Sequence, residues 1–193
     1  MHDVLASHGG ALFFQAASDP PAVAFHRDGL CSLTSPSLTL ALHDVIAVEE
    51  KVSKLFNSTL KSITNRDQLD LLETRGFDNF KLRDRGRYDM TLNISDFSCF
   101  ENPPWLPVVQ QILGGQARLQ HFGCMMSLPS SATQNWHSDG PHRSKHTHLP
   151  AYMLNCFVPL VDMTRALGGT QIQPGSHVHH DFMIRTTCQR QQQ

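Results

Sequence analysis

Hydrophobic residues in the first half of the chain recur at the three- and four-residue spacing of amphipathic helices. The strongest pattern follows Ser35-Pro36, a pair suited to an N-cap with proline at the first helical position. Its apolar positions are Leu38, Leu42, Val45, Val48, Val52 and Leu55. Further helices are expected over 66–75 and over 102–113, where Gly114-Gly115 provides the stop. The first half is therefore predicted to be mainly helical.

The pattern changes near residue 117 to short segments rich in β-forming residues, separated by turn sequences. Strands are expected over 117–128, 134–140, 152–160 and 170–174. Several short strands of this kind are typical of an all-β sandwich or barrel. The predicted order is thus helices first, followed by a β domain.

Four other segments carry weaker signals. Residues 1–24 lack sustained periodicity and are interpreted as a loose N-terminal arm, while the apolar patch 29–33 is expected to form a first strand. The charged stretch 83–87 is interpreted as a solvated loop, with Arg87-Tyr88 facing the substrate entrance as the alternative. Residues 181–193 show no apolar alternation and are predicted to be a disordered tail.

Length and composition limit the class of protein. A chain of 193 residues is long enough for one domain with a core, and a net charge of -1 does not favour nucleic acid or a membrane surface as partner. Its five cysteines show no C-x-x-C spacing, and no segment has the pattern of a membrane span or a secretory signal. An intracellular protein with reduced thiols is expected, whereas the oligomeric state is not indicated.

Histidine is the unusual component. Seven of the 12 histidines follow residue 136, at 137, 142, 146, 148, 177, 179 and 180. The first of them belongs to the sequence Trp136-His137-Ser138-Asp139-Gly140. On a strand, side chains two residues apart share a face, so His137 and Asp139 could be two ligands of a 2-His-1-carboxylate metal site. Because His-x-Asp is common by chance, a surface turn with a solvated His137 remains the alternative.

Three longer segments, in order, resemble the phytanoyl-CoA dioxygenase-like (PhyH) family. Residues 128–140 (LPSSATQNWHSDG) are similar to its metal-binding strand, and 154–162 (LNCFVPLVD) to the next core strand. Residues 168–177 (GGTQIQPGSH) are similar to its glycine turn, strand and Pro-Gly-Ser-His sequence. The resemblance implies one domain over 25–180, a double-stranded β-helix (a cupin-like jelly roll, mainly β or α+β) with N-terminal supporting helices and its β core from about residue 117.

The same resemblance implies an Fe(II)-dependent dioxygenase with 2-oxoglutarate as cosubstrate, which uses O2 to hydroxylate a small organic substrate. His137 and Asp139 would be the first two iron ligands. Asn155, on the strand after the ligands, and Gln134, just before them, are candidates to contact the cosubstrate. The alternatives are a hydrogen-bonded polar residue within the sheet for Asn155 and support of a turn for Gln134.

The third ligand of the family is a histidine in a later strand, followed by an arginine that pairs with the far carboxylate of 2-oxoglutarate. Residues 178–193 match neither element, and Arg185 and Arg190 come without a strand to present them. His177 is a weaker candidate for the third ligand, with a loop-stabilising or surface role favoured. The third ligand and the second half of the jelly roll are therefore expected beyond Gln193, so that this chain alone would be an inactive fragment.

Two other functions stay open. A non-catalytic binding or regulatory protein could retain the family architecture without a complete site. A zinc-dependent hydrolase could use His137, Asp139 and one of the later histidines, because zinc accepts such ligands and keeps a water in its open position. No His-Glu-x-x-His element supports the hydrolase.

Overall fold

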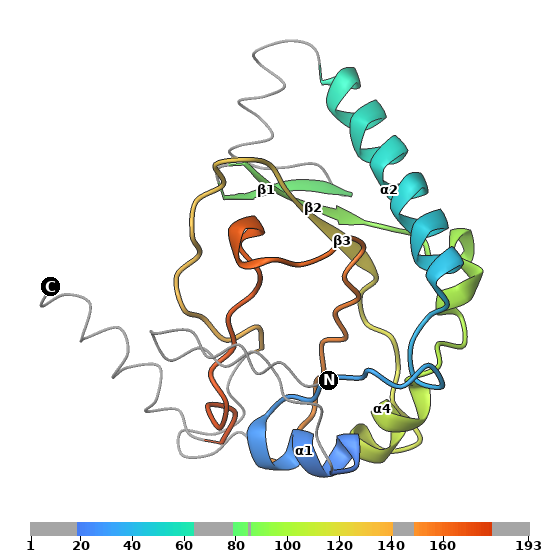
Figure 1. Cartoon of the computed structure of the whole chain (residues 1–193), viewed down its shortest axis with the longest axis vertical. Coiled ribbons are helices and arrows are strands. Elements are labelled where there is room, and N and C mark those ends of the chain that lie inside the picture. Colours follow the sequence, from blue (N-terminus) through green and yellow to red (C-terminus); the bar gives the residue numbers. More distant parts are fainter. Residues whose placement is uncertain (1–18, 64–78, 85, 141–148, 179–193) are drawn as a thin grey trace, which may run out of the picture.

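The computed structural model describes residues 19–63, 79–84, 86–140 and 149–178 (Figure 1). Within this part of the chain the α-helices are α1 (Pro21–Asp28), α2 (Leu42–Ser62) and α4 (Leu106–Leu113). The strands are β1 (Phe80–Asp84), β2 (Arg87–Thr91) and β3 (Gly123–Ser127). Short 3-10 turns follow at η1 (Ile94–Asp96), η2 (Ser98–Phe100) and η3 (Arg165–Leu167).

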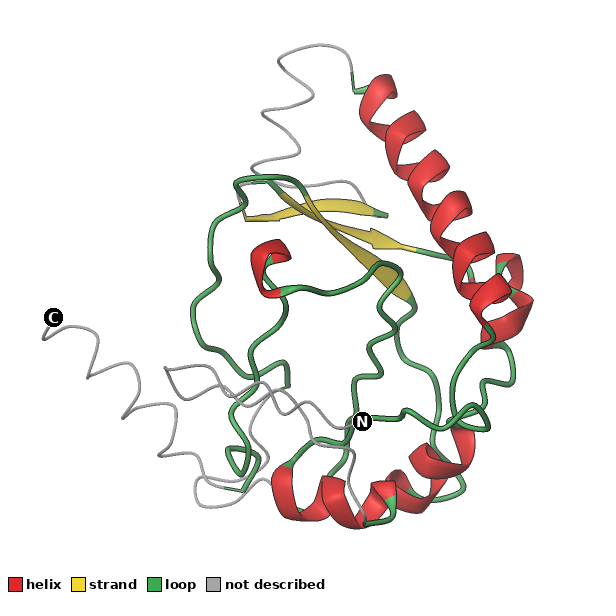
Figure 2. Cartoon of the chain, in the orientation of Figure 1, coloured by secondary structure: helices red, strands yellow, loops and turns green. Residues whose placement is uncertain are grey.

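The three strands form one antiparallel sheet in the order β1-β2-β3 (Figure 2). The register places Phe80 opposite Met90 and Met90 opposite Cys124. A tight turn joins β1 to β2, and its Gly86 has φ +74°, a left-handed conformation that favours glycine. Since successive side chains on a strand alternate between the faces, Tyr88 and Met90 share one face of the sheet.

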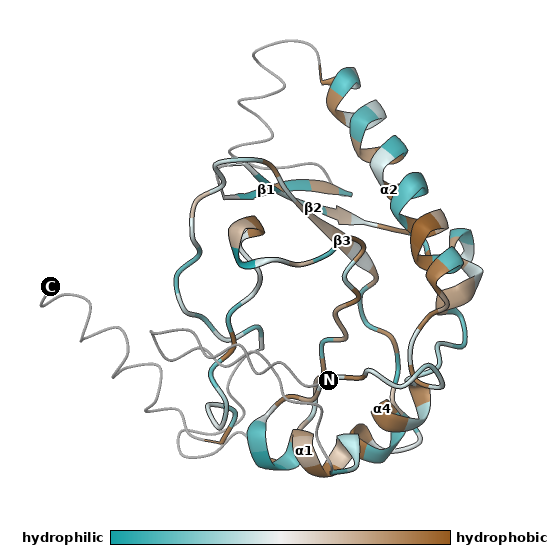
Figure 3. Ribbon diagram, viewed as in Figure 1, coloured by the Kyte–Doolittle hydropathy of each residue, from teal (hydrophilic) through white to brown (hydrophobic). Residues whose placement is uncertain are grey.

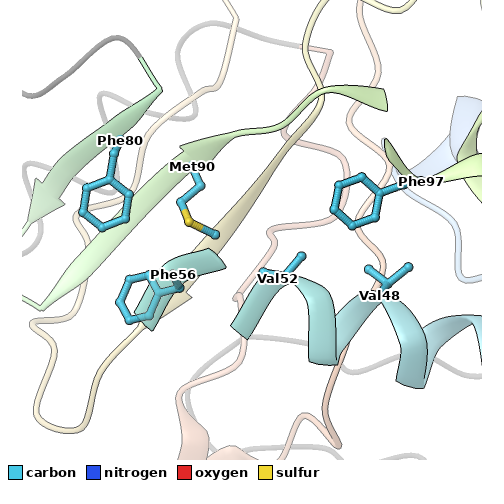
Figure 4. Close-up of a cluster of buried hydrophobic side chains, with 6 residues drawn as sticks. All are labelled: Val48, Val52, Phe56, Phe80, Met90 and Phe97. Atoms are coloured by element: carbon cyan, nitrogen blue, oxygen red, sulfur yellow. The ribbon is translucent and has the colours of Figure 1, made fainter. Parts of the chain in front are cut away.

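Helix α2 covers that face and builds the main core. Its Val48, Val52 and Phe56 recur every four residues, which places them on one side of the helix. They pack against Phe80, Met90 and Phe97 (Figure 4). Val52 is 1% exposed and Met90 is 2% exposed, and each such buried side chain contributes roughly 1.5–3 kcal/mol. Figure 3 shows hydrophilic and hydrophobic residues alternating along α2, as this one-sided burial requires.

A second, smaller core joins α1 to α4. Phe25 from α1 packs with Val108 and Ile112 from α4. The predicted helix over 102–113 is confirmed, although it begins four residues later than expected and ends before Gly114. Helix α4 thus lies beside α1, the first described helix, and is followed by the segment that leads into β3 (Figure 1).

The expected loose arm is corrected over its last residues, because 21–28 form helix α1. Pro21 lies in the first turn, where a missing N–H costs nothing, and Gly29 ends the helix at φ +79° with its N–H on Phe25 O, 2.7 Å away. Residues 29–33 then form no strand, since none of the described strands supplies hydrogen bonds to them.

The long helix begins at Leu42 rather than after Ser35. Residues 35–38 form a turn in which Leu38 N donates to Ser35 O at 2.8 Å, and the hydroxyl of Thr39 also donates to that carbonyl. Hydroxyl side chains that bond to nearby backbone favour turns over helix. At its other end the helix continues to Ser62, seven residues past Leu55.

The described part of the charged stretch 83–87 is not simply a solvated loop: residues 83–84 end β1 and residue 87 begins β2. Arg83 and Asp89 form an ion pair with 2.6 Å between Nη2 and Oδ2. This pairing explains why charged residues can lie in strands here. The charges of 83–87 concealed the alternation of Phe80 and Leu82 in the sequence.

Of the expected β segments, only 117–128 contains a strand, β3. The segments 134–140, 152–160 and 170–174 are not strands in the described structure, because strand pairing requires a neighbouring ladder and the three described strands pair only with one another. The described residues therefore show a small antiparallel sheet with helices rather than a whole jelly roll. The expected helix at 66–75, the arm before residue 19 and the tail at 181–193 lie outside the described residues.

Candidate metal centre

His137 and Asp139 lie side by side although their segment is not a strand. His137 Nε2 is 3.2 Å from Asp139 Oδ1. The other ring nitrogen, Nδ1, lies 2.8 Å from the backbone carbonyl of Asn135. A carbonyl only accepts, so Nδ1 is the donor in this contact and Nε2 is the ring nitrogen that faces Asp139. Donation of the second ring N–H to a backbone carbonyl is the usual arrangement of a histidine that binds a metal.

Asp139 is held from its other side by Asn155. The Asn155 amide Nδ2 donates to Asp139 Oδ2 at 2.6 Å, a charge-assisted hydrogen bond. This bond occupies one carboxylate oxygen and directs the other, Oδ1, toward His137. The structure thus brings Asn155 to the metal pair, while its predicted contact with a cosubstrate stays a prediction.

The spacing of the two donor atoms fits a shared metal ion. Two ligand atoms about 2.1 Å from a metal and at right angles around it are about 3.0 Å apart. The observed separation of 3.2 Å is close to that value. The same separation is also that of an ordinary His–Asp ion pair, so the distance fits a shared metal ion without requiring one.

The pair is open to solvent on its remaining sides. The side chains of His137 and Asp139 are 54% and 48% exposed. Within the described ranges, no group of three or more His, Cys, Asp or Glu side chains is arranged to hold a metal ion. The residues present therefore fit two of the protein ligands of a metal and leave other coordination positions free.

His177 lies elsewhere, against the end of α1. Its Nε2 donates to the carbonyl of His26 at 3.1 Å, and its ring is 6.5 Å from that of Phe25. Its Nδ1 is buried, has no hydrogen-bond partner among the described residues and faces Gly29, where any β-carbon would collide with the ring. Gly175 N also donates to Asp28 O at 2.8 Å. The arrangement fits the loop-stabilising role and does not bring His177 to the pair.

The two other candidates from the sequence, Gln134 and Arg87, differ in their contacts. Gln134 is exposed and makes no hydrogen bond to the described residues. Arg87, at the start of β2, donates from Nη2 to the carbonyl of Ala132 at 3.2 Å, so it contacts the chain that leads to His137. The roles of Arg87 and of Asn155 were not evident from the sequence, because both depend on contacts between distant segments that no local pattern encodes.

A comparison with protein families shows the family of the chain. The family model for phytanoyl-CoA dioxygenase (PhyH) matches residues 25–193, and the chain belongs to that family. Its members are typically oxygenases with a cupin-like jelly-roll fold. No solved structure matches the chain. None of the described helices is long and apolar enough to cross a membrane.

Proposed function

We propose that the protein is an Fe(II)- and 2-oxoglutarate-dependent dioxygenase that hydroxylates a small organic molecule, with His137 and Asp139 as two of its iron ligands. The observation that carries the proposal is the 3.2 Å separation of His137 Nε2 and Asp139 Oδ1, with each side chain oriented by a second hydrogen bond. Membership of the phytanoyl-CoA dioxygenase family supports the oxygenase reaction.

The residues of the site perform separate tasks. Asn135 O holds the proton on His137 Nδ1 and so keeps the Nε2 lone pair available. Asn155 holds Asp139 Oδ2, which favours binding through Oδ1 alone and preserves coordination positions for other ligands. When bound, iron and 2-oxoglutarate supply the oxidising chemistry that inserts oxygen into a C–H bond of the substrate.

The proposal predicts that 2-oxoglutarate binds to the iron-loaded protein and not to the metal-free protein. An anaerobic titration should therefore give the visible charge-transfer absorption of an iron–2-oxo acid chelate when 2-oxoglutarate is added after Fe(II). Succinate added in its place, which lacks the 2-oxo group, should give no such band. No band with wild-type protein that has bound iron would contradict the dependence on 2-oxoglutarate.

A non-catalytic binding or regulatory protein is the second candidate. It is favoured by the fact that the described residues contain no third ligand beside His137 and Asp139. Succinate formation from 2-oxoglutarate, measured for the longest product of the gene with iron and ascorbate, separates the two functions. Turnover that is lost in His137→Ala excludes the non-catalytic function, and metal analysis of anaerobically purified protein decides between iron and zinc.

A further inference from the structure

We propose that Arg87 is a positioning residue that clamps the segment carrying His137 and Asp139 to the β1–β2 hairpin. Residues 132–138 have no strand pairing, so ladder hydrogen bonds do not hold this segment in place. A metal site needs its ligands fixed, because ligand orientation depends on the contacts that surround them. The positioning role of Arg87 does not depend on the proposed function. Only its expected effect on metal binding rests on that function.

The hairpin turn holds the chain that leaves β3. The carbonyl of Gly86 accepts hydrogen bonds from Leu128 N at 2.8 Å and from Ser131 Oγ at 2.9 Å. A β-carbon at position 86 would lie 3.0 Å from that hydroxyl oxygen, and φ is +74° there. Glycine therefore permits both the turn and the close approach of Ser131.

Arg87, the residue after Gly86, makes two further hydrogen bonds to the chain, one on each side of the turn that follows β3. Its Nε donates to Ser127 Oγ at 3.3 Å, and its Nη2 donates to the carbonyl of Ala132 at 3.2 Å. The planar guanidinium reaches both acceptors at once, which the single ammonium group of lysine cannot do in the same geometry. The bonded residues bracket the whole turn between β3 and the ligand segment.

Arg87 is only partly buried, and both of its hydrogen bonds lie at exposed positions. The third guanidinium nitrogen of Arg87, Nη1, is buried and has no partner among the described residues. An unpaired buried donor costs free energy, and the hydrogen bonds of Nε and Nη2 offset part of that cost. Ala132 is five residues before His137, and Asn155 fixes Asp139 at the other end. The two anchors together limit how far the ligand pair can move.

The test compares Arg87→Met and Arg87→Lys with Lys81→Met. Met retains the apolar stem of Arg87 without its hydrogen bonds, and lysine can reach one acceptor. Lys81 is an exposed cation on β1 of the same hairpin, so its variant controls for loss of charge. The measurements are amide hydrogen exchange of peptides covering 128–140 in the metal-free protein, and the dissociation constant for Co(II) as a probe of the pair.

Arg87→Met is expected to accelerate exchange in 128–140 and to weaken Co(II) binding roughly tenfold, the lower end for residues that support a metal ligand. Arg87→Lys should fall between this variant and the wild type, and Lys81→Met should match the wild type. Wild-type exchange in Arg87→Met, or equal acceleration in Lys81→Met, would overturn the proposal. If Arg87→Met fails to fold by circular dichroism, Arg87→Lys decides by the same criteria.

The two proposals fail separately. If the wild-type protein binds no Co(II), or binds it equally well in His137→Ala, the proposed metal site is wrong. Hydrogen exchange in 128–140 would still decide whether Arg87 positions this segment.

Discussion

Removing the Asn155 amide tests whether the orientation of Asp139 matters for metal binding. In the structure Asn155 Nδ2 donates to Asp139 Oδ2 at 2.6 Å, which leaves Oδ1 directed toward His137 Nε2. In Asn155→Ala the carboxylate loses this partner and can rotate. Metal binding must then fix an Asp139 carboxylate that is free to rotate. The loss of side-chain freedom weakens binding, and Asn155 no longer directs Oδ1 toward His137.

The size of the effect follows from the chemistry and exposure of this contact. Loss of a group that orients a metal ligand typically weakens binding about 10- to 100-fold. Both side chains are exposed, so water can replace part of the lost hydrogen bond. The expected result is therefore at the lower end, about tenfold or about 1.4 kcal/mol.

Anaerobic titration with Co(II) or Fe(II), followed by calorimetry, measures this change. Gln134→Ala is the matched control, because Gln134 is an exposed amide of the ligand segment without a hydrogen bond to Asp139. It should bind the metal as the wild type does in the absence of 2-oxoglutarate. Wild-type affinity in Asn155→Ala would refute the reasoning that this amide orients the carboxylate.

The remaining predictions concern the core, a thiol and an ion pair. Met90→Ala should lower the free energy of unfolding, measured in urea, by about 2–5 kcal/mol because Met90 is 2% exposed. Met125 on β3 is 51% exposed, so Met125→Ala should change this free energy by less than about 0.5 kcal/mol. Burial raises the pKa of the Cys124 thiol from 9.0 to about 11. Iodoacetamide at pH 8 should therefore leave Cys124 unmodified until urea unfolds the chain, and rapid alkylation of the native protein would contradict this. The stability that the buried neutral thiol contributes below pH 9 should be lost as the pH rises toward 11. Arg83→Met should destabilise the protein by about 2–3 kcal/mol because it leaves the Asp89 carboxylate buried without its cation. Adding Asp89→Asn should recover most of that loss. No recovery in the double variant would show that loss of the ion pair is not the cause.

The helices were predictable where local spacing and stop signals agree. Val48 and Val52 carry the four-residue period of α2, and Gly114 ends α4 as expected. The start of α2 was not predictable from Ser35-Pro36, because the serine carbonyl is used in a turn instead. Local signals therefore located α2 and α4, but neither the first residue of α2 nor helix α1, which lay within the expected loose arm.

The β structure was harder to predict because pairing is not a local property. The hairpin of β1 and β2 was hidden by its charges, although Gly86 between the apolar alternations of Phe80 and Tyr88 was a usable turn signal. Conversely, residues 152–160 have strand-like composition without a strand partner among the described residues. Composition favours an extended backbone but does not supply the neighbouring ladder.

That His137 and Asp139 lie close together was predictable from the His-x-Asp motif, but the geometric reason is different, and their role as metal ligands stays a prediction. The prediction assumed a strand that presents both side chains on one face. In the structure the pair is brought together by a hydrogen bond to Asn135 O and by Asn155 from a separate segment. The sequence pointed to these two residues, whereas the contacts that orient their side chains required the fold.

The most direct test of the metal site compares His137→Ala with His43→Ala by equilibrium binding of Fe(II) without oxygen. The His43–Asp44 pair on α2 has a similar Nε2–Oδ1 separation of 3.3 Å, but its histidine is 82% exposed and no hydrogen bond to another described residue fixes its ring. We predict that the wild type and His43→Ala bind one Fe(II) per chain with equal affinity and that His137→Ala loses at least about 100-fold, the upper range for damage to a metal site. Retained stoichiometric iron in His137→Ala would contradict the assignment of His137 and Asp139 as iron ligands.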